Sequence, residues 1–152
     1  MEAKRGRVCA LRRAAFEGYV GVVRLLLEKR SALYAKKDLR DPLVAAVHRG
    51  HGDIVQLLLE HGADVNADAG GCETVLMEAA RRGHDVVVKR LLEKGADIEI
   101  GDVAEHRALH YAVCYRNKEI VRMLLKHGAD PEARDFWGQS TRFGCFAGRR
   151  WA

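Results

Sequence analysis

Seven histidines and four cysteines are the residues of this 152-residue chain that could bind a metal or transfer protons. The cysteines, Cys9, Cys72, Cys114 and Cys145, share no short spacing, so neither a paired zinc site nor a disulfide framework is indicated. His106 and Cys72 could meet between neighbouring loop tips, but two ligands do not complete a metal site. We therefore expect no metal and reduced, unpaired thiols.

The spacing of the histidines indicates structural roles instead. His51 and His84 each follow a glycine, whereas His61 and His127 each precede one. An imidazole in the last turn of a helix can bond the free carbonyls there. No serine or cysteine nucleophile is accompanied by a recognisable histidine and acid, and no glycine-rich phosphate loop is present. The chain is therefore not expected to be an enzyme or to hold a cofactor.

The elements that carry these histidines recur with a fixed period. The tripeptide Gly-Ala-Asp begins at Gly62, Gly95 and Gly128, at intervals of 33 residues, and each time it follows an apolar run, at 54–59, 87–92 and 120–125. A similar run at 22–27 lies 32 residues before its successor, so one residue is missing from the first connection, near 38–40. Such a period is typical of a solenoid, in which each unit buries its apolar face against a neighbour.

A second, shorter helical pattern precedes each run, at 41–46, 74–80 and 107–112. Together these features closely resemble the ankyrin repeat, whose signature is Thr-Pro-Leu-His-x-Ala followed by a second helix and a hairpin loop. Thr74, Pro42 and His110 each keep one residue of that signature. The resemblance covers about residues 5 to 148. It implies that His110 acts as a hydrogen-bonding brace between loop and helix.

The resemblance implies a single domain that is an all-α-dominated solenoid of helix–turn–helix units with hairpin loops. Four repeats are expected at about 5–37, 38–70, 71–103 and 104–136, with a partial unit at 137–152. Within the second repeat, the spacing predicts that Leu43, Ala46 and Val47 face inward.

Two positions at which the repeats differ carry further expectations. Arg90 occupies the position equivalent to Leu57. Because an arginine is accepted there, we expect Leu57 to be partly exposed to solvent and the next residue, Leu58, to be buried. Glu105 stands where the last unit has Gly138, so a turn that needs a positive φ would be strained there.

The ends of a solenoid expose what its middle buries, so terminal repeats act as caps. Arg12 and Arg13 suit an outer face on the first unit. At the other end, either the partial unit covers the fourth repeat or the chain is a piece of a longer array. The side chains that would form such a cover are Phe143, Phe146 and Trp151.

Composition narrows the possible partners. The net charge of +5 is a mild excess, spread over the repeats, and is not the footprint of a nucleic-acid-binding protein. Arg12 and Arg13 interrupt any secretory signal, and no stretch approaches the ~20 apolar residues of a membrane span. We expect a monomer in the cytoplasm or nucleus that binds neither nucleic acid nor membrane.

Ankyrin proteins use loop tips and the exposed side of the first helices as a concave binding face, and the resemblance places two groups there. A basic strip comprises Arg49, Arg81, Arg82 and Arg116, and an aromatic group comprises Tyr111, Tyr115, Phe136 and Trp137. Glu78 and His106 also map to this face. Alternatively, the charges are solvated and the aromatic rings pack on the next repeat.

The expected function is that of a protein–protein interaction module or adaptor. Its partner would be another protein that presents an acidic and apolar segment to the two groups. Two alternatives remain open: a regulatory inhibitor similar to the small all-ankyrin kinase inhibitors, and a fragment of a larger multidomain ankyrin protein.

Overall fold

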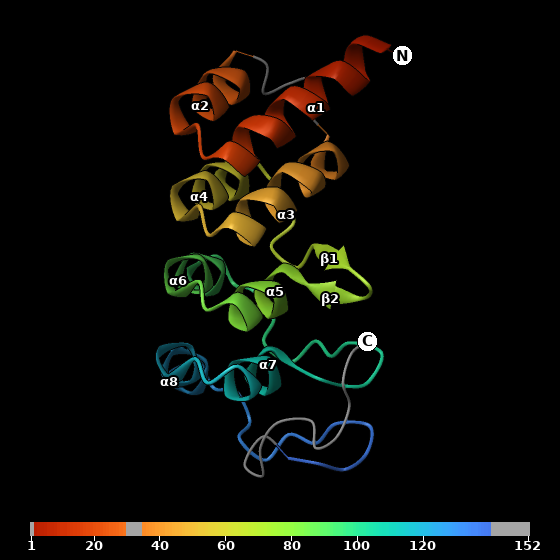
Figure 1. The fold of residues 1–152 in the computed structure, drawn as a ribbon, viewed down its shortest axis with the longest axis vertical. Helices are drawn as coiled ribbons and strands as arrows, with labels where there is room; N and C mark the ends of the chain where they lie inside the picture. Colours follow the sequence, from red (N-terminus) through yellow and green to blue (C-terminus); the bar gives the residue numbers. More distant parts are fainter. Residues whose placement is uncertain (1, 30–34, 141–152) are drawn as a thin grey trace.

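A computed structural model of the chain describes residues 2–29 and 35–140 (Figure 1). The expected cap residues Phe143, Phe146 and Trp151 lie outside the described residues. The helices form consecutive pairs joined by tight turns, as the repeat pattern predicts. The pairs are α1 (Glu2–Glu17) with α2 (Val20–Glu28), α3 (Arg40–Arg49) with α4 (Gly52–Glu60), α5 (Val75–Arg82) with α6 (Asp85–Glu93), and α7 (Ala108–Cys114) with α8 (Lys118–Lys126).

The pairs stack in sequence order to give two layers of helices (Figure 1). The first helices α1, α3, α5 and α7 contact one another in turn, and so do the second helices α2, α4, α6 and α8. The loops between pairs project from the side of the first-helix layer (Figure 1). The architecture is a mostly helical repeat solenoid, as predicted.

A glycine between the two helices of a pair lets successive pairs approach closely. Gly50 ends α3 with a φ of 77°, a left-handed conformation that favours glycine. A Cβ atom at Gly50 would lie 2.7 Å from the ring of His84 in the next repeat. The Nε2 atom of His84 lies 3.2 Å from the His48 carbonyl oxygen, so this histidine joins neighbouring repeats.

The remaining histidines predicted to be structural also bond the backbone. The Nε2 atom of His51 lies 3.1 Å from the Phe16 carbonyl oxygen. The Nδ1 atoms of His61 and His127 each lie 2.8 Å from a carbonyl oxygen in the preceding helical turn. His110 accepts a hydrogen bond from the Arg107 amide at 3.0 Å, which is the expected brace at the start of α7.

The loops are less uniform than the repeat predicts. Strands β1 (Asp68–Gly70) and β2 (Glu73–Thr74) form an antiparallel hairpin between α4 and α5. In the shorter first connection, the 3-10 helix η2 (Lys36–Leu39) leads directly into α3. Aspartates order the loop starts, because Asp64, Asp97 and Asp130 each accept a hydrogen bond at 2.9 Å from the amide two residues further along.

The core is a continuous ribbon of small and branched apolar residues between the two layers. Leu43, Ala46 and Val47 are fully buried, as the spacing predicts. Leu58 is also fully buried. The expectation that Leu57 is partly open is wrong, because only 8% of Leu57 is exposed. Its equivalent, Arg90, is only half-buried, so the repeat accepts either side chain at this position.

Candidate functional site

The first-helix layer and the loops beside it form what we call the inner face. Equivalent residues of successive repeats form columns along it. One column contains Arg13, Ala45, Glu78 and Tyr111, and the next contains Glu17, Arg49, Arg82 and Tyr115. The expected binding residues therefore lie on one side of the molecule, and their environments decide which of them a partner could reach.

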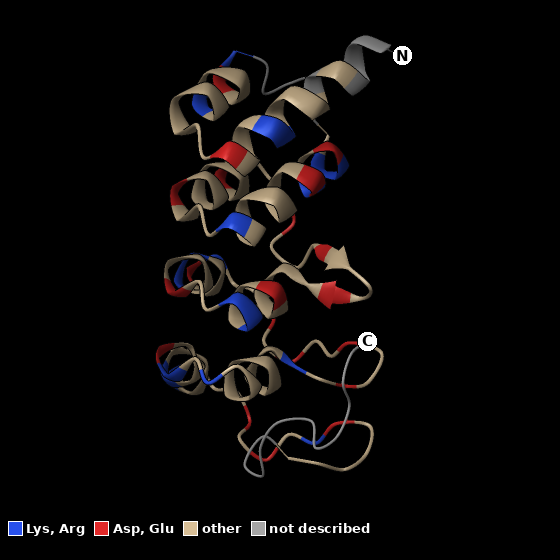
Figure 2. Ribbon diagram, in the orientation of Figure 1, with Lys and Arg blue, Asp and Glu red and all other residues tan. Residues whose placement is uncertain are grey.

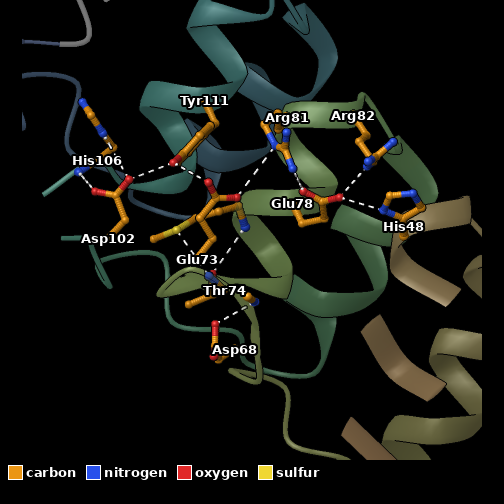
Figure 3. Close-up of polar contacts among 12 residues, drawn as sticks. His48, Asp68, Glu73, Thr74, Glu78, Arg81, Arg82, Asp102, His106 and Tyr111 are labelled. Atoms are coloured by element: carbon orange, nitrogen blue, oxygen red, sulfur yellow. Dashed lines mark hydrogen bonds and ion pairs between the residues drawn. The ribbon is translucent and has the colours of Figure 1, made fainter. Parts of the chain in front are cut away.

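A buried carboxylate lies at the centre of the inner face. Glu78, on α5, forms ion pairs with Arg81 and Arg82 of the same helix (Figure 3). Its Oε1 atom also lies 3.1 Å from the Nδ1 atom of His48, on α3. Arg81 reaches Glu73 of β2 with a separation of 3.8 Å. This cluster joins the second repeat to the third.

The polar contacts continue through Tyr111, on α7. Its hydroxyl oxygen lies 2.8 Å from an Asp102 carboxylate oxygen and 3.1 Å from one of Glu73 (Figure 3). Asp102 in turn lies 3.1 Å from the Nδ1 atom of His106, and the Nε2 atom of His106 lies 3.6 Å from Asp135. Together with the Glu78 cluster, these residues form a polar ladder that runs from the second repeat to the end of the fourth.

The electrostatics of the polar ladder favour its charged form. Burial opposes ionisation of Glu78, but hydrogen bonds from Arg82 and Arg81 outweigh it and lower the pKa of the carboxyl. Burial likewise opposes the charge on Arg81, yet its bond to Glu78 raises the pKa of the guanidinium. The pKa of Asp102 is lowered, because hydrogen bonds from Tyr111 and the His106 backbone exceed the effect of burial.

Tyr111 and His110 are held in their neutral forms. Burial and the neighbouring Asp102 carboxylate raise the pKa of the Tyr111 hydroxyl. Burial and the proximity of His106 lower the pKa of His110. These shifts fit groups that brace loops against helices.

The polar ladder changes the status of five expected site residues. Glu78, His106 and Tyr111 are buried, so they support the inner face and do not form its surface. Arg81 and Arg82 are only partly exposed and share the carboxylate of Glu78. The positive charge of the expected basic strip is therefore partly neutralised at these two arginines.

The exposed aromatic residues lie further along the inner face. Phe136 is 73% exposed, and its amide donates to the Ala104 carbonyl at 2.9 Å, which ties the fourth loop to the third. The rings of Phe136 and Trp137 lie 5.7 Å apart, and the Trp137 ring lies 5.8 Å from that of His106. Val103 is also exposed. We call Val103, Phe136 and Trp137 the loop-tip cluster.

The loop-tip cluster rests on an ordered loop. The Oδ1 atom of Asp135 accepts hydrogen bonds from the amides of Trp137 and Gln139 at 2.9 and 2.8 Å. Asp102 plays the same part in the third loop, where it accepts from the amides of Ala104 and His106. Ordered loops keep the exposed rings in place before any partner arrives, which lowers the entropic cost of binding.

A pocket of about 390 Å³ opens on the inner face near its N-terminal end. Its lining residues come from α1, α3 and the first hairpin: Arg12, Phe16, Arg40, Asp41, Val44, Ala45, His48 and Ala69. The guanidinium of Arg49 lies 5.0 Å from the centre of the Phe16 ring, a cation–π arrangement. Sequence reasoning missed Phe16 and Val44, although the repeat register places both in the first-helix columns.

Arg40 closes one side of this pocket. Its Nε atom donates to the Asp68 carbonyl at 2.9 Å, and its guanidinium pairs with the Asp68 carboxylate at 3.1 Å. Arg12, which the sequence assigned to an outer cap, faces this pocket instead. Arg13 pairs with Glu17 at 2.9 Å in the neighbouring columns. The expected polar cap on the first repeat is therefore absent at these two arginines.

Basic and acidic residues are interspersed along the helices and loops of the described chain (Figure 2). In residues 2–29 and 35–140, no group of three or more histidine, cysteine or acidic side chains could hold a metal ion. Within the same ranges, no helix is both long and apolar enough to cross a membrane. Cys9 and Cys72 are exposed free thiols.

Comparison with known proteins identifies the repeat. A family model described as ankyrin repeats in three copies matches residues 3–69 and 66–135. The chain belongs to the ankyrin repeat family. It is also 45% identical over 56 residues to the ankyrin repeat and KH domain-containing protein mask of Drosophila melanogaster. That match covers 36% of this chain and 1% of the relative.

Ankyrin repeats are a general protein–protein interaction module and are typically non-catalytic. The buried polar ladder suits that role, because it fixes the positions of neighbouring repeats relative to one another. Accessible side chains remain on the same face, above and beside the ladder: Tyr115, Phe136, Trp137 and Arg49.

Proposed function

We propose that this ankyrin protein binds a partner protein through its inner face, with the loop-tip cluster as the main contact. The observation that carries the proposal is the exposure of Phe136 and Trp137 on a hydrogen-bonded loop. Large aromatic side chains dominate interface energetics when a partner buries them. Tyr115, half-exposed at the end of α7, extends the same surface.

The partner segment is apolar with a small number of acidic residues. Arg49 supplies an exposed positive charge next to Phe16, and Arg12 supplies another in the pocket nearby. Arg81 and Arg82 add less, because Glu78 already neutralises part of their charge. The expected contribution of charge is therefore mainly to the rate of association.

We further propose that the protein acts as an adaptor in the cytoplasm or nucleus, where exposed thiols such as Cys9 and Cys72 stay reduced. The charges interspersed along the chain support a protein partner in preference to nucleic acid or membrane (Figure 2).

Affinity capture with the full chain, followed by mass spectrometry, tests the proposal. A specific partner should be retained by the wild type and depleted at least about tenfold by Phe136→Ala. Val86→Ala is the matched control, because Val86 on α6 is similarly exposed but lies outside the inner face. Equal capture by wild type and Phe136→Ala would contradict the proposal.

The identity and activity of the captured protein also distinguish the adaptor function from the inhibitor function. If an enzyme is captured, its activity is measured with increasing amounts of the ankyrin chain. Unchanged activity supports the adaptor, whereas a stoichiometric loss of activity assigns the inhibitory role.

A further inference from the structure

The pocket near the N-terminal end of the inner face lies where the polar ladder stops. One of its lining residues is Ala45, which is the equivalent of Glu78 in the third repeat and of Tyr111 in the fourth. Glu78 and Tyr111 fill this position with polar side chains of the ladder. The side chain of Ala45 ends at its Cβ atom, so the second repeat leaves a hollow of about 390 Å³ at this position.

The third repeat shows what a side chain at this position contacts. Glu78 forms ion pairs with Arg81 and Arg82, which lie three and four positions later on the same helix (Figure 3). Burial opposes ionisation of Glu78, but hydrogen bonds from Arg82 and Arg81 outweigh it and lower the pKa of the carboxyl. The surroundings of this position in the third repeat therefore stabilise a negative charge.

The second repeat keeps basic residues at the same spacing but lacks the carboxylate. His48 and Arg49, the equivalents of Arg81 and Arg82, lie three and four positions after Ala45. His48 also lines the pocket, and Arg49 is exposed beside it. The second repeat thus has the surroundings of Glu78 without a glutamate of its own.

The charges around the pocket leave an excess of positive charge. Arg40 pairs with Asp68, so its charge is already compensated. Neither Arg12, which lines the pocket from α1, nor Arg49 forms an ion pair within the described part of the chain. Asp41 also lines the pocket and offsets one of these two arginines. An acidic occupant would complement the remaining charge.

The rest of the pocket lining is mostly apolar. Phe16 occupies the position of His48 in the preceding repeat, and 38% of it is exposed. Val44 and Ala69 continue the apolar surface from α3 and β1. Since the guanidinium of Arg49 lies 5.0 Å from the centre of the Phe16 ring, a positive charge and an apolar wall adjoin. Such a pocket suits an acidic side chain that has a large apolar neighbour.

We infer that this pocket binds an acidic side chain of the partner protein, with an adjacent large apolar side chain of the partner against Phe16. The carboxylate takes the position in the second repeat that Glu78 takes in the third, and it accepts hydrogen bonds from Arg12 and Arg49. The inference rests on the proposed function, because it assigns the same partner a second contact besides the loop-tip cluster.

Selection from a phage-displayed library of random peptides, with the full chain as bait, tests the inference. Peptides that the wild type selects should carry an aspartate or glutamate beside a large apolar residue. Ala45→Glu fills the pocket with a carboxylate of the chain itself, so it should weaken the binding of these peptides at least about tenfold. Val86→Glu, the control on α6, adds the same charge outside the inner face and should bind them as the wild type does.

Thermal melting gives a second readout that needs no ligand. Ala45→Glu should melt about 2 °C higher than the neutral isostere Ala45→Gln, because the basic residues around the pocket then pair with the new carboxylate. The difference should shrink at high salt and when Arg49→Gln is added to both variants. Arg49→Gln alone changes only an exposed side chain, so it also tests peptide binding in a folded protein.

The outcomes separate this inference from the proposed function. Peptides that Phe136→Ala releases and Ala45→Glu does not would overturn the inference and leave the loop-tip cluster as the binding site. Peptides that only Ala45→Glu releases would support the pocket and contradict the loop-tip cluster as the main contact. A selection without any peptide sensitive to Ala45→Glu would overturn the inference. An Ala45→Glu variant that melts no higher than Ala45→Gln would overturn it equally.

Discussion

Among residues 2–29 and 35–140, three that are not glycine adopt a backbone conformation that favours glycine. Glu105 has a φ of 60° and Arg116 a φ of 61°, whereas the equivalent positions in other repeats hold Gly138 and Gly83 with φ of 75° and 76°. Cys72, equivalent to Glu105 in the preceding loop, has a φ of 67°. The turn geometry is thus set by the repeat, and these side chains adopt it under strain.

We predict that Glu105→Gly and Arg116→Gly each stabilise the protein, by up to about 1 kcal/mol. Both side chains are exposed, so their loss removes little packing, while glycine takes the left-handed conformation without strain. Urea denaturation measures the change. Gly138→Ala is the converse control and should lower stability. Lower stability of Glu105→Gly would show that the carboxylate makes a contact worth more than the strain.

The ionised carboxylate of Glu78 gives a pH-dependent contribution to stability. Its folded-state pKa lies below its unfolded-state pKa, so the contribution is present above the unfolded value. It is lost as the pH falls through the folded-state pKa. Glu78→Gln removes the charge and leaves Arg81 and Arg82 with a neutral acceptor.

Glu78→Gln should therefore reduce the free energy of unfolding by about 1–2 kcal/mol at neutral pH, a value discounted for the partial exposure of both arginines. The difference from wild type should shrink as the pH is lowered into the acid range. Denaturant melts at several pH values test this. Glu119→Gln, in an exposed pair with Arg122, is the control and should change stability little. If the free energies of unfolding of Glu78→Gln and the wild type differed by the same amount at all pH values, the loss would come from packing and not from the charge of Glu78.

At the scale of elements, periodicity predicted the helices because each unit must end its first helix with a tight turn and bury one side of its second helix. A left-handed residue follows each first helix, a glycine in the first three repeats and Arg116 in the fourth, and the apolar run after it marks the buried stripe of the second helix. The first loop was less predictable. Its connection is one residue shorter, and the described part of it forms η2 where a hairpin was expected.

Burial within the second helices leads to a graded stability prediction. Leu58→Ala and Leu91→Ala should each cost about 2–5 kcal/mol, because both side chains are fully buried and their loss leaves a cavity. Leu57→Ala should cost less, because the equivalent position in the next repeat accepts the half-buried Arg90. Denaturant melts of the three variants provide the comparison. Equal losses at Leu57 and Leu58 would contradict this order.

At the scale of the whole molecule, the sequence predicted that the expected site residues share one side of the molecule, but not which of them are accessible. The repeat register placed Glu78 and Tyr111 in one column. Their burial depends on partners from other elements, namely His48 of α3 and Asp102 of the third loop. Such contacts depend on rotamers and loop paths, which periodicity does not determine. Phe136 and Trp137 were expected at a loop tip and are exposed there, because few elements can cover a tip.

Charged and aromatic residues of the inner face are expected to affect different rate constants of binding: charge the association rate, and the aromatic rings the dissociation rate. Arg49 is the better residue for testing the contribution of positive charge to binding, because it contacts the uncharged Phe16 ring. Arg82 is less suitable, because it forms an ion pair with the buried Glu78 and its replacement would also disturb the fold. Once a partner is captured, Arg49→Glu should slow association, and the effect should diminish as salt is added. Surface plasmon resonance at several ionic strengths measures this.

Trp137→Ala should act mainly on the dissociation rate constant. The partner buries the Trp137 ring only in the formed complex, so loss of the ring weakens that complex without slowing the first encounter. A loss of about 2 kcal/mol in binding corresponds to about 30-fold faster dissociation, with folding intact by circular dichroism. Lys89→Glu on α6 and Arg122→Glu on α8 are controls, since both lie on second helices away from the inner face. If only these controls weaken binding, the partner docks on the second-helix layer, and the loop-tip cluster has no part in recognition.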